Sequence, residues 1–163
     1  MQYTELKINE LDHIYAMFED KLAYFGLKEH AFLDLKKDFP KEVLEKVDHA
    51  SLSFEKELHE YFKGELKVFK TPIYLSGTDF QKSVYDILIK VPYGKTVSYN
   101  DLALELGDVK KVRALANAVG RNRHLIIVPC HRVIAKDGSL GGFSSGLDLK
   151  RALMKVENIV LTK

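Results

Sequence analysis

The chain has 163 residues, of which 46% are hydrophobic, a formal net charge of +2 and a single cysteine. This length fits one domain or two small ones, with enough apolar side chains for a core. A lone cysteine excludes an internal disulfide and fits a reducing compartment. No apolar run is long enough to cross a membrane, and the N-terminal residues do not resemble a signal peptide. We therefore expect a protein of the cytoplasm, or of the nucleus in a eukaryote, without membrane contact.

The charge is divided unevenly along the chain. Residues 1–70 carry 11 Lys and no Arg against 15 acidic residues, whereas residues 71–163 carry 9 Lys and 5 Arg against 8 acidic residues. The net charges of the two halves are therefore −4 and +6. This difference fits either an ordinary scatter of surface charge or a second half that binds an acidic partner such as a nucleic acid.

The first half predicts a small β-meander followed by a helix. Leu6 and Ile8 alternate with polar residues, and apolar stretches at 14–18 and 22–25 flank a turn at 19–21. Apolar residues at helical spacing then predict an amphipathic helix over 51–63, which Gly64 ends.

The histidines of the first half do not predict a metal site. They have neither the spacing of metal ligands nor cysteine partners, and they are His13, His30, His49 and His59. We expect neither a metal nor a cofactor. Residues 70–77 predict a linker, which gives an N-terminal α/β domain at 1–75 and a C-terminal, mostly helical domain at 76–163.

The second half predicts a helix-turn-helix. An apolar face over 80–91 predicts a first helix, and 92–95 is a turn. Ser98 with Asp101 three residues later resembles a capping box and opens a second helix, which Gly107 ends. A further helix is predicted over 109–119, and the short turn between these last two helices is typical of helix-turn-helix proteins.

This last helix has two predicted faces. The core face is Val112, Leu115, Ala116 and Val119. The other face is Lys110, Arg113, Ala114 and Asn117. That second face is basic at one end and small elsewhere, which fits an ordinary solvated surface or close approach to the backbone of a partner.

The single cysteine follows an apolar stretch, 125–128, that predicts a buried strand ended by Pro129. Cys130 is either a small buried hydrophobe or a nucleophile. His131 and Arg132 follow directly, and such cations lower the pKa of a thiol. Because adjacent strand residues point to opposite faces, Cys130 and His131 can cooperate only if the chain turns after Pro129 or a water bridges them.

Residues 129–133, Pro-Cys-His-Arg-Val, resemble the active-site motif of the O6-alkylguanine-DNA alkyltransferases. The resemblance extends in the family's order over roughly residues 61–157 and includes the stretches 77–81, 91–99, 113–122 and 141–147. It implies an α/β protein with a helix-turn-helix and an active-site strand. The implied activity is irreversible, single-use transfer of an alkyl group from O6-alkylguanine in duplex DNA to Cys130.

The resemblance also implies residue roles. Cys130 is the nucleophile, His131 the base, and Glu157 the group that orients His131. Asn122 braces the turn before the active site, and the hydroxyl of Tyr99 serves the leaving guanine and packs near the phosphate.

By the same resemblance, the last helix enters the minor groove and Arg113 fills the gap left by the flipped nucleotide. The other residues implied in DNA contact are Tyr99, Lys110, Lys111, Ala114, Asn117 and Arg123. The implied substrate-pocket residues are Val133, Phe143 and Ser144. The partner is double-stranded DNA that contains O6-alkylguanine. We expect a monomer, and the sequence leaves cooperative binding along DNA open.

The chain departs from the family pattern at two places. Residues 123–125 are Arg-His-Leu where the family often has prolines, and Phe143 stands where tyrosine is common. The cysteines that hold zinc in some members are absent, whereas the alkyltransferase-like proteins lack the cysteine that is present here. Two other functions stay open: a helix-turn-helix regulator that senses alkylation of Cys130, and a cysteine hydrolase that uses Cys130, His131 and Glu157.

Overall fold

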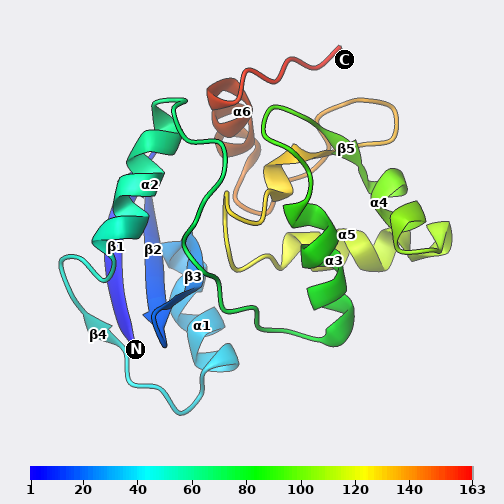
Figure 1. The fold of residues 1–163 in the computed structure, drawn as a ribbon. Coiled ribbons are helices and arrows are strands. Elements are labelled where there is room, and N and C mark those ends of the chain that lie inside the picture. The colour runs from blue at the N-terminus through cyan, green and yellow to red at the C-terminus, as the bar shows by residue number, and fades with distance from the viewer. Residues whose placement is uncertain (163) are drawn as a thin grey trace. The chain divides into compact units, whose positions relative to one another are not determined.

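The computed structural model describes residues 1–162, and the chain folds into two compact units, Met1–Gly77 and a second from Thr78 onward (Figure 1). The fold is mixed α/β, with the strands mainly in the first unit and the helices mainly in the second, as the sequence predicts. None of the described helices is long and apolar enough to span a bilayer.

The first unit contains a four-stranded sheet of order β3-β2-β1-β4. The strands are β1 (Gln2–Ile8), β2 (Leu11–Phe18), β3 (Lys21–Leu27) and β4 (Glu45–Lys46). The first three form the predicted antiparallel meander, and β4 pairs in parallel with β1. Both hairpin turns have two residues with positive φ, Asn9–Glu10 and Glu19–Asp20, which is the geometry that matches the twist of the strands.

Helices α1 (Lys28–Asp38) and α2 (Leu52–Phe62) cover opposite faces of this sheet. Ile14 and Ala16 pack with Leu35 of α1, whereas Tyr15 packs against Phe54 of α2. Alternation along β2 therefore serves two cores, and this explains why β2 is apolar on both faces. Helix α2 matches the predicted helix, but α1 and β4 are additions that the sequence analysis did not predict.

The predicted linker is partly a component of the first unit. Leu22 donates its amide to the Pro72 carbonyl at 2.8 Å, and the Tyr74 amide donates to the Leu22 carbonyl at 2.8 Å. Tyr74 also packs edge-on against Phe18. These backbone bonds extend the sheet edge at β3, so the stretch up to residue 74 is fixed and does not act as a free tether.

The second unit is built around three helices that pack together: α3 (Asp79–Ile89), α4 (Tyr99–Glu105) and α5 (Val112–Gly120). Thr78 and Gln81 form a capping box at α3, and the Ser98 hydroxyl accepts a hydrogen bond from the Asp101 amide at α4. The predicted helix-turn-helix is confirmed as α4 and α5. Its second helix begins with a separate 3₁₀ turn, η1 (Val109–Lys111), rather than running unbroken from residue 109.

The buried face of α5 differs from the prediction at three positions. Leu115, Ala118 and Val119 are buried, whereas the predicted core residues Val112 and Ala116 are only half-buried. Ala118 is buried as well, and its carbonyl accepts a hydrogen bond from the Tyr85 hydroxyl at 3.0 Å.

The remaining elements of the second unit are short. They are β5 (Val97–Ser98), η2 (Cys130–Arg132), β6 (Val133–Ile134) and α6 (Leu147–Val156). Strands β5 and β6 pair in parallel, and α6 packs against η2. The parallel pair brings the start of α4 beside the segment that follows the cysteine.

The predicted strand at 125–128 is wrong. These residues form a compact turn in which the Val128 amide donates to the His124 carbonyl at 2.9 Å and Ile126 has φ of +72°. Such a φ is unusual for a β-branched residue and requires support from the surroundings. The run is apolar because it is buried, and burial alone does not distinguish a strand from a buried turn.

Candidate active site and nucleic-acid interface

Asn122 holds the turn before the cysteine. Its side-chain Nδ2 donates to the Val128 carbonyl at 2.8 Å and approaches Cys130 Sγ at 3.2 Å, while its Oδ1 accepts from the His124 amide at 2.9 Å. One amide side chain therefore replaces the ladder hydrogen bonds that a strand would supply, and it ties the turn to the sulfur. The bracing geometry that the resemblance implied for Asn122 is present.

Cys130 begins the 3₁₀ helix η2, and its side chain is buried. Burial raises the pKa of the thiol to about 11, although the Asn122 hydrogen bond and the positive charge of Lys150 act in the opposite direction. The thiol is therefore protonated at neutral pH. The expectation of a lowered thiol pKa is wrong for the resting protein, because loss of hydration outweighs the cations.

His131 and Glu157 form a buried pair. His131 Nε2 lies 2.6 Å from Glu157 Oε1, and both side chains are fully shielded from solvent. Burial lowers the pKa of His131 despite the carboxylate, so the imidazole is neutral and able to take a proton. The chain turns into η2 at Cys130 and does not continue as a strand, so the side chains of Cys130 and His131 are not fixed on opposite faces of a strand.

The Arg132 guanidinium binds the carboxylate of Glu157 and not the sulfur of Cys130. Its Nε and Nη2 donate to the two oxygens of Glu157, each at 2.9 Å, and Nη1 donates to the Val91 carbonyl at 2.6 Å. Burial would raise the pKa of Glu157, but the hydrogen bonds of His131 and Arg132 lower it overall. The carboxylate is thus held ionised, and the predicted role of Arg132 as a cation near the thiol is not what the geometry gives.

The turn after α3 completes the shell around the carboxylate. The Gly94 amide donates to Glu157 Oε2 at 3.0 Å, and the Tyr93 hydroxyl donates to the Val156 carbonyl at 3.0 Å. Gly94 has φ of +74°, and a Cβ there would lie 3.3 Å from the Glu157 carbonyl oxygen. Only glycine fits this turn without strain.

Lys150 is a site residue that the sequence analysis missed. Its side chain is on α6 and fully buried, and Nζ donates to the carbonyls of Val133, Leu140 and Gly142 at 2.7, 2.6 and 3.0 Å. The sequence does contain a signal for it, because positions 150, 153, 154 and 157 follow the i, i+3, i+4, i+7 spacing of a core stripe. This spacing places two charged residues on the same helix face as two apolar ones.

Tyr99 and the loop before α6 border the same region. Burial raises the pKa of Tyr99, and the negative charge of an ionised Cys130 acts in the same direction. Gly141 has φ of +70°, and a Cβ there would lie 3.7 Å from the Tyr99 ring. Of the predicted pocket residues, Val133 is buried, Phe143 is half-buried with its ring 6.0 Å from Lys150 Nζ, and Ser144 is exposed.

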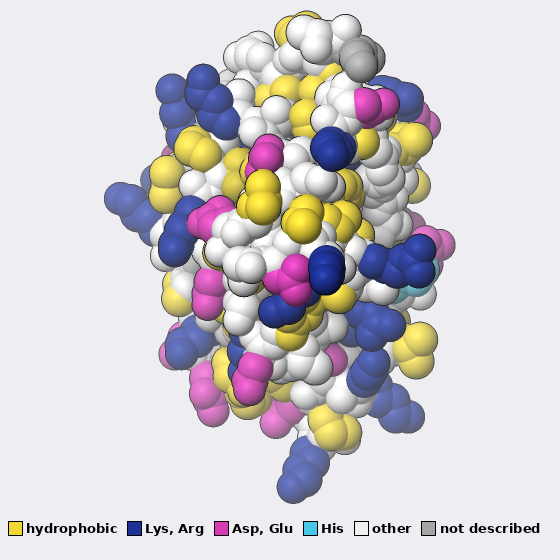
Figure 2. Space-filling model, turned by 90° about the vertical axis from the view of Figure 1, so that its right-hand side faces the viewer, with side chains coloured by type: hydrophobic (Ala, Val, Ile, Leu, Met, Phe, Trp, Pro, Cys, Tyr) yellow, Lys and Arg dark blue, Asp and Glu magenta, His cyan; other side chains and the backbone are white. Residues whose placement is uncertain are grey.

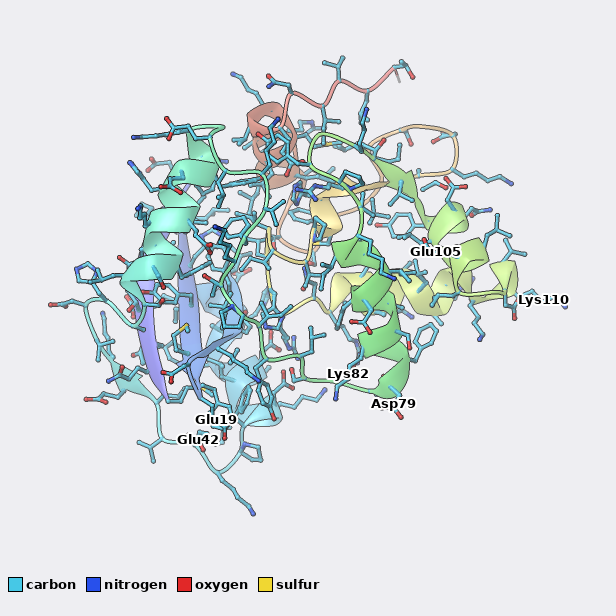
Figure 3. All side chains as sticks on the ribbon, viewed as in Figure 1. Glu19, Glu42, Asp79, Lys82, Glu105 and Lys110 are labelled. Carbon is cyan, nitrogen blue, oxygen red and sulfur yellow. The ribbon has the colours of Figure 1, made fainter. Side chains whose placement is uncertain are left out.

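The predicted DNA-contacting residues lie on a different part of this unit. Those on η1 and α5 are exposed: Lys110, Lys111, Arg113, Ala114 and Asn117. Arg123 is half-buried, on the segment that leads to the active-site turn. The Lys110 side chain extends outward from the turn between α4 and α5 (Figure 3). Figure 2 shows Lys and Arg interspersed with Asp and Glu on the face that it presents, not one continuous basic patch.

Fold and site together define the class: a helix-turn-helix unit that contains a buried cysteine beside a histidine–glutamate pair. The sequence of residues 79–159 matches the protein-family model described as 6-O-methylguanine DNA methyltransferase, DNA binding domain. The constitutive methylated-DNA–protein-cysteine methyltransferase of Bacillus subtilis is 36% identical, with 96% of this chain and 93% of that protein aligned. The chain belongs to the methylated-DNA–protein-cysteine methyltransferase family.

Two further relatives differ in how much of the chain they cover. The Methanosarcina acetivorans methylated-DNA–protein-cysteine methyltransferase is 48% identical over 102 residues, which are 63% of this chain and 65% of that protein. The match thus spans just under two thirds of the length of that relative. The crystal structure of Mycobacterium tuberculosis OGT in complex with DNA superposes with a TM-score of 0.84 at 32% identity, covering 96% of this chain and 92% of the other.

Proposed function

We propose that this protein repairs alkylated DNA by moving the alkyl group of O6-alkylguanine in duplex DNA onto its own Cys130, once per molecule. The observation that carries the proposal is the buried Cys130 beside the His131–Glu157 pair, on the same unit as the helix-turn-helix. The names of the relatives, and the DNA-bound state of the mycobacterial structure, support it.

The proposed reaction is a displacement at the alkyl carbon. The Cys130 thiol gives its proton to the neutral His131, the sulfur forms a bond to the alkyl carbon, and the bond from that carbon to guanine O6 breaks. Glu157 holds the resulting imidazolium, and the hydroxyl of Tyr99 donates a hydrogen bond to the departing guanine. A thioether is a poor leaving group, so each molecule reacts once.

Because the thiol pKa is about 11, the resting protein holds little thiolate. We infer that the thiolate fraction rises when the alkylated nucleobase occupies the pocket, which limits side reactions of the single cysteine in the protein without DNA. Asn122, with its hydrogen bond to the sulfur, is proposed to hold Sγ in place before and during the reaction.

The proposed DNA contact runs through the exposed face of η1 and α5. Lys110, Lys111 and Arg123 meet phosphates, Ala114 and Asn117 allow close approach to the backbone, and Arg113 fills the gap left by the flipped nucleotide. Phe143, Ser144 and Val133 line the base pocket. In this proposal residues 76–163 carry DNA binding and transfer, and the protein acts as a monomer in the compartment that holds DNA.

The test is intact mass after incubation with a duplex that contains one O6-methylguanine. We expect a gain of one methyl per molecule, located at Cys130, and no reaction of Cys130→Ala while duplex binding is kept. Since the chain has one cysteine, thiol modification has one assignment. Conversion of many substrate molecules by each protein molecule would contradict single-use transfer and favour a hydrolase.

A further inference from the structure

Lys150 is a charged residue at a fully buried position, where a charge lowers the stability of the fold. A buried ammonium costs several kcal/mol unless hydrogen bonds replace its hydration. Here the three N–H donors have three acceptors, and all three acceptors are neutral carbonyls of β6 and of the loop that precedes α6. A Met side chain would fill a similar volume without this cost, so packing alone does not account for a lysine.

The carbonyls that Lys150 binds belong to segments around the proposed pocket. Val133 is three residues after Cys130, and Leu140 and Gly142 lie directly before Phe143 and Ser144. The side chain therefore ties the active-site segment to the loop from within. Its charge also favours the Cys130 thiolate and disfavours protonated His131.

We infer that Lys150 is a positioning residue whose ammonium holds the loop 140–144 closed against residues 130–133, where its positive charge acts on Cys130. The inference rests on the proposed function for its role in alkyl transfer. The loop clamp and the effect on the thiolate are properties of the protein without DNA, so they can be tested separately.

The same ammonium makes the clamp sensitive to alkaline pH. Burial lowers the pKa of Lys150 to about 8, although the charge on Cys130 acts in the opposite direction. The charge of Lys150 also acts on the Cys130 thiol and the His131 imidazole of η2, and the Tyr99 ring of α4 lies beside Gly141 in the loop. On α6 itself Asp148 and Arg151 are exposed and form their own ion pair. Above about pH 8 the lysine loses one donor and its charge, and the loop should open.

The test measures the rate at which iodoacetamide alkylates Cys130 by intact mass, with no DNA present, between pH 6.5 and 10. Wild type is compared with Lys150→Met, with Lys150→Arg and with the control Lys155→Met, an exposed lysine on the same helix. We expect Lys150→Met to slow thiolate alkylation by about tenfold at pH 7.5, equivalent to ~1.4 kcal/mol. The control should match wild type.

A second measurement uses wild type alone and so does not depend on a variant that folds. Hydrogen exchange of amides 140–146, corrected for the intrinsic pH dependence, should accelerate with a midpoint near pH 8, while exchange in α5 stays protected. Lys150→Arg, which stays charged throughout, should lack this step. Loop exchange without a step in wild type, or loop exchange at neutral pH that is equally slow in Lys150→Met and wild type, would overturn the inference.

Alkyl transfer from an O6-methylguanine duplex completes the set. If wild type takes no methyl group, the proposed function fails while the iodoacetamide and exchange results still decide the role of Lys150. If wild type transfers normally and Lys150→Met transfers at the same rate, the proposed function stands and the positioning role is wrong.

Discussion

The two units of this protein bury different kinds of side chain. In the first unit the buried interior is dominated by aromatic and aliphatic groups such as Tyr15, Phe25 and Phe54, with Thr4 and His13 as buried polar residues. In the second unit the buried polar and charged residues are His124, His131, Arg132, Lys150 and Glu157. Because buried charge costs free energy that apolar packing does not, we propose that its concentration in the second unit marks the place where the chemistry is carried out.

The first unit supplies a useful counterpart to the histidine–glutamate pair. Glu55 accepts a hydrogen bond from the Tyr15 hydroxyl and lies 2.8 Å from His49 Nδ1. The same hydroxyl accepts from the Ser51 amide and so fixes the start of α2. His49 is exposed, and this network connects elements without a nucleophile. A glutamate beside a histidine is thus structural in one unit and, we propose, catalytic in the other.

The largest expected effect on the transfer rate comes from disrupting the His131–Glu157 pair of the second unit. Glu157→Gln removes the charge that holds His131, so we expect methyl transfer to slow on the order of 10²–10⁴-fold. It also leaves Arg132 buried without its carboxylate, which costs about 3–5 kcal/mol of stability. Single-turnover rates and thermal melts measure the two effects.

Glu55→Gln is the matched control for that change. It should lower the melting temperature by weakening the Tyr15 contact and leave the transfer rate per folded molecule at the parental value. If Glu157→Gln, once shown to be folded, also transferred at the parental rate, the proposed role of the His131–Glu157 pair in taking the thiol proton would be wrong.

The pH dependence of stability should differ between wild type and Cys130→Ala. The folded-state pKa of the thiol is about 11 against an ordinary value of 9.0. Because the pKa of the Cys130 thiol is higher in the folded protein than in the unfolded chain, the neutral thiol stabilises the fold at pH values below 9.0. This contribution to the free energy of unfolding is lost as the pH rises to 11. Two units correspond to roughly 3 kcal/mol. Between pH 8 and 11, the free energy of unfolding of Cys130→Ala should therefore rise relative to that of wild type by this amount.

A difference between two proteins is needed because other buried groups titrate in the same range. The pKa of Tyr15 is raised to about 12 by burial and by Glu55, and that contribution cancels in the comparison. Denaturant unfolding at several pH values measures the difference. A constant difference across the range would show that the thiol is not perturbed as described.

The sequence predicted elements whose signals are local. The meander followed from alternation around two short turns, α2 and α3 from apolar spacing, and the start of α4 from Ser98. Contacts that join distant residues were not available to such reasoning. Helix α1 has a weak apolar pattern, with exposed Phe32 and Leu33 beside buried Ala31 and Leu35. Its position depends on the sheet that it covers.

The candidate site shows the same division. Cys130 and its neighbours were identified from the motif, but the partners of each group depend on tertiary contacts. Arg132 turns to Glu157, 25 residues away, and the cation that acts on the sulfur is Lys150. The apolar run 125–128 was misassigned because the Asn122 side chain, not a neighbouring strand, satisfies part of its backbone.

A smaller effect should separate base flipping from DNA affinity. Arg113 is exposed on α5, where a long side chain can fill the gap left by an extruded base. We expect Arg113→Ala to lower the transfer rate on duplex DNA by about tenfold, or ~1.4 kcal/mol. The reaction with free O6-benzylguanine, which needs no flipping, should change little.

Lys110→Ala is the control on the same surface. It should weaken duplex binding and reduce the slope of log affinity against log salt by about 1, because it removes one phosphate contact. If Arg113→Ala slowed the reactions with duplex and free base equally, Arg113 would support the fold or the pocket, and the role in flipping would have to be abandoned.

The smallest expected effect compares two serine caps, one in each unit. Ser51 accepts from the Phe54 amide at 3.3 Å at the start of α2, and Ser98 accepts from the Asp101 amide at 3.0 Å at the start of α4. Replacing either with Ala should cost about 1 kcal/mol of stability. The two substitutions thus remove the same kind of cap, one in a unit with a mainly apolar interior and one in a unit with buried charged residues.

Only the Ser98 cap stands directly before Tyr99 and the helix-turn-helix, so only Ser98→Ala should also affect the reaction with DNA. We expect Ser98→Ala to lower the transfer rate on duplex DNA by about threefold, since fraying of the first turn of α4 moves the phenol away from the leaving guanine. Ser51→Ala should melt earlier and react normally. Equal losses of rate in both variants would mean that transfer depends on overall stability. The proposal that only the second unit carries out DNA binding and transfer would then have no support from these positions.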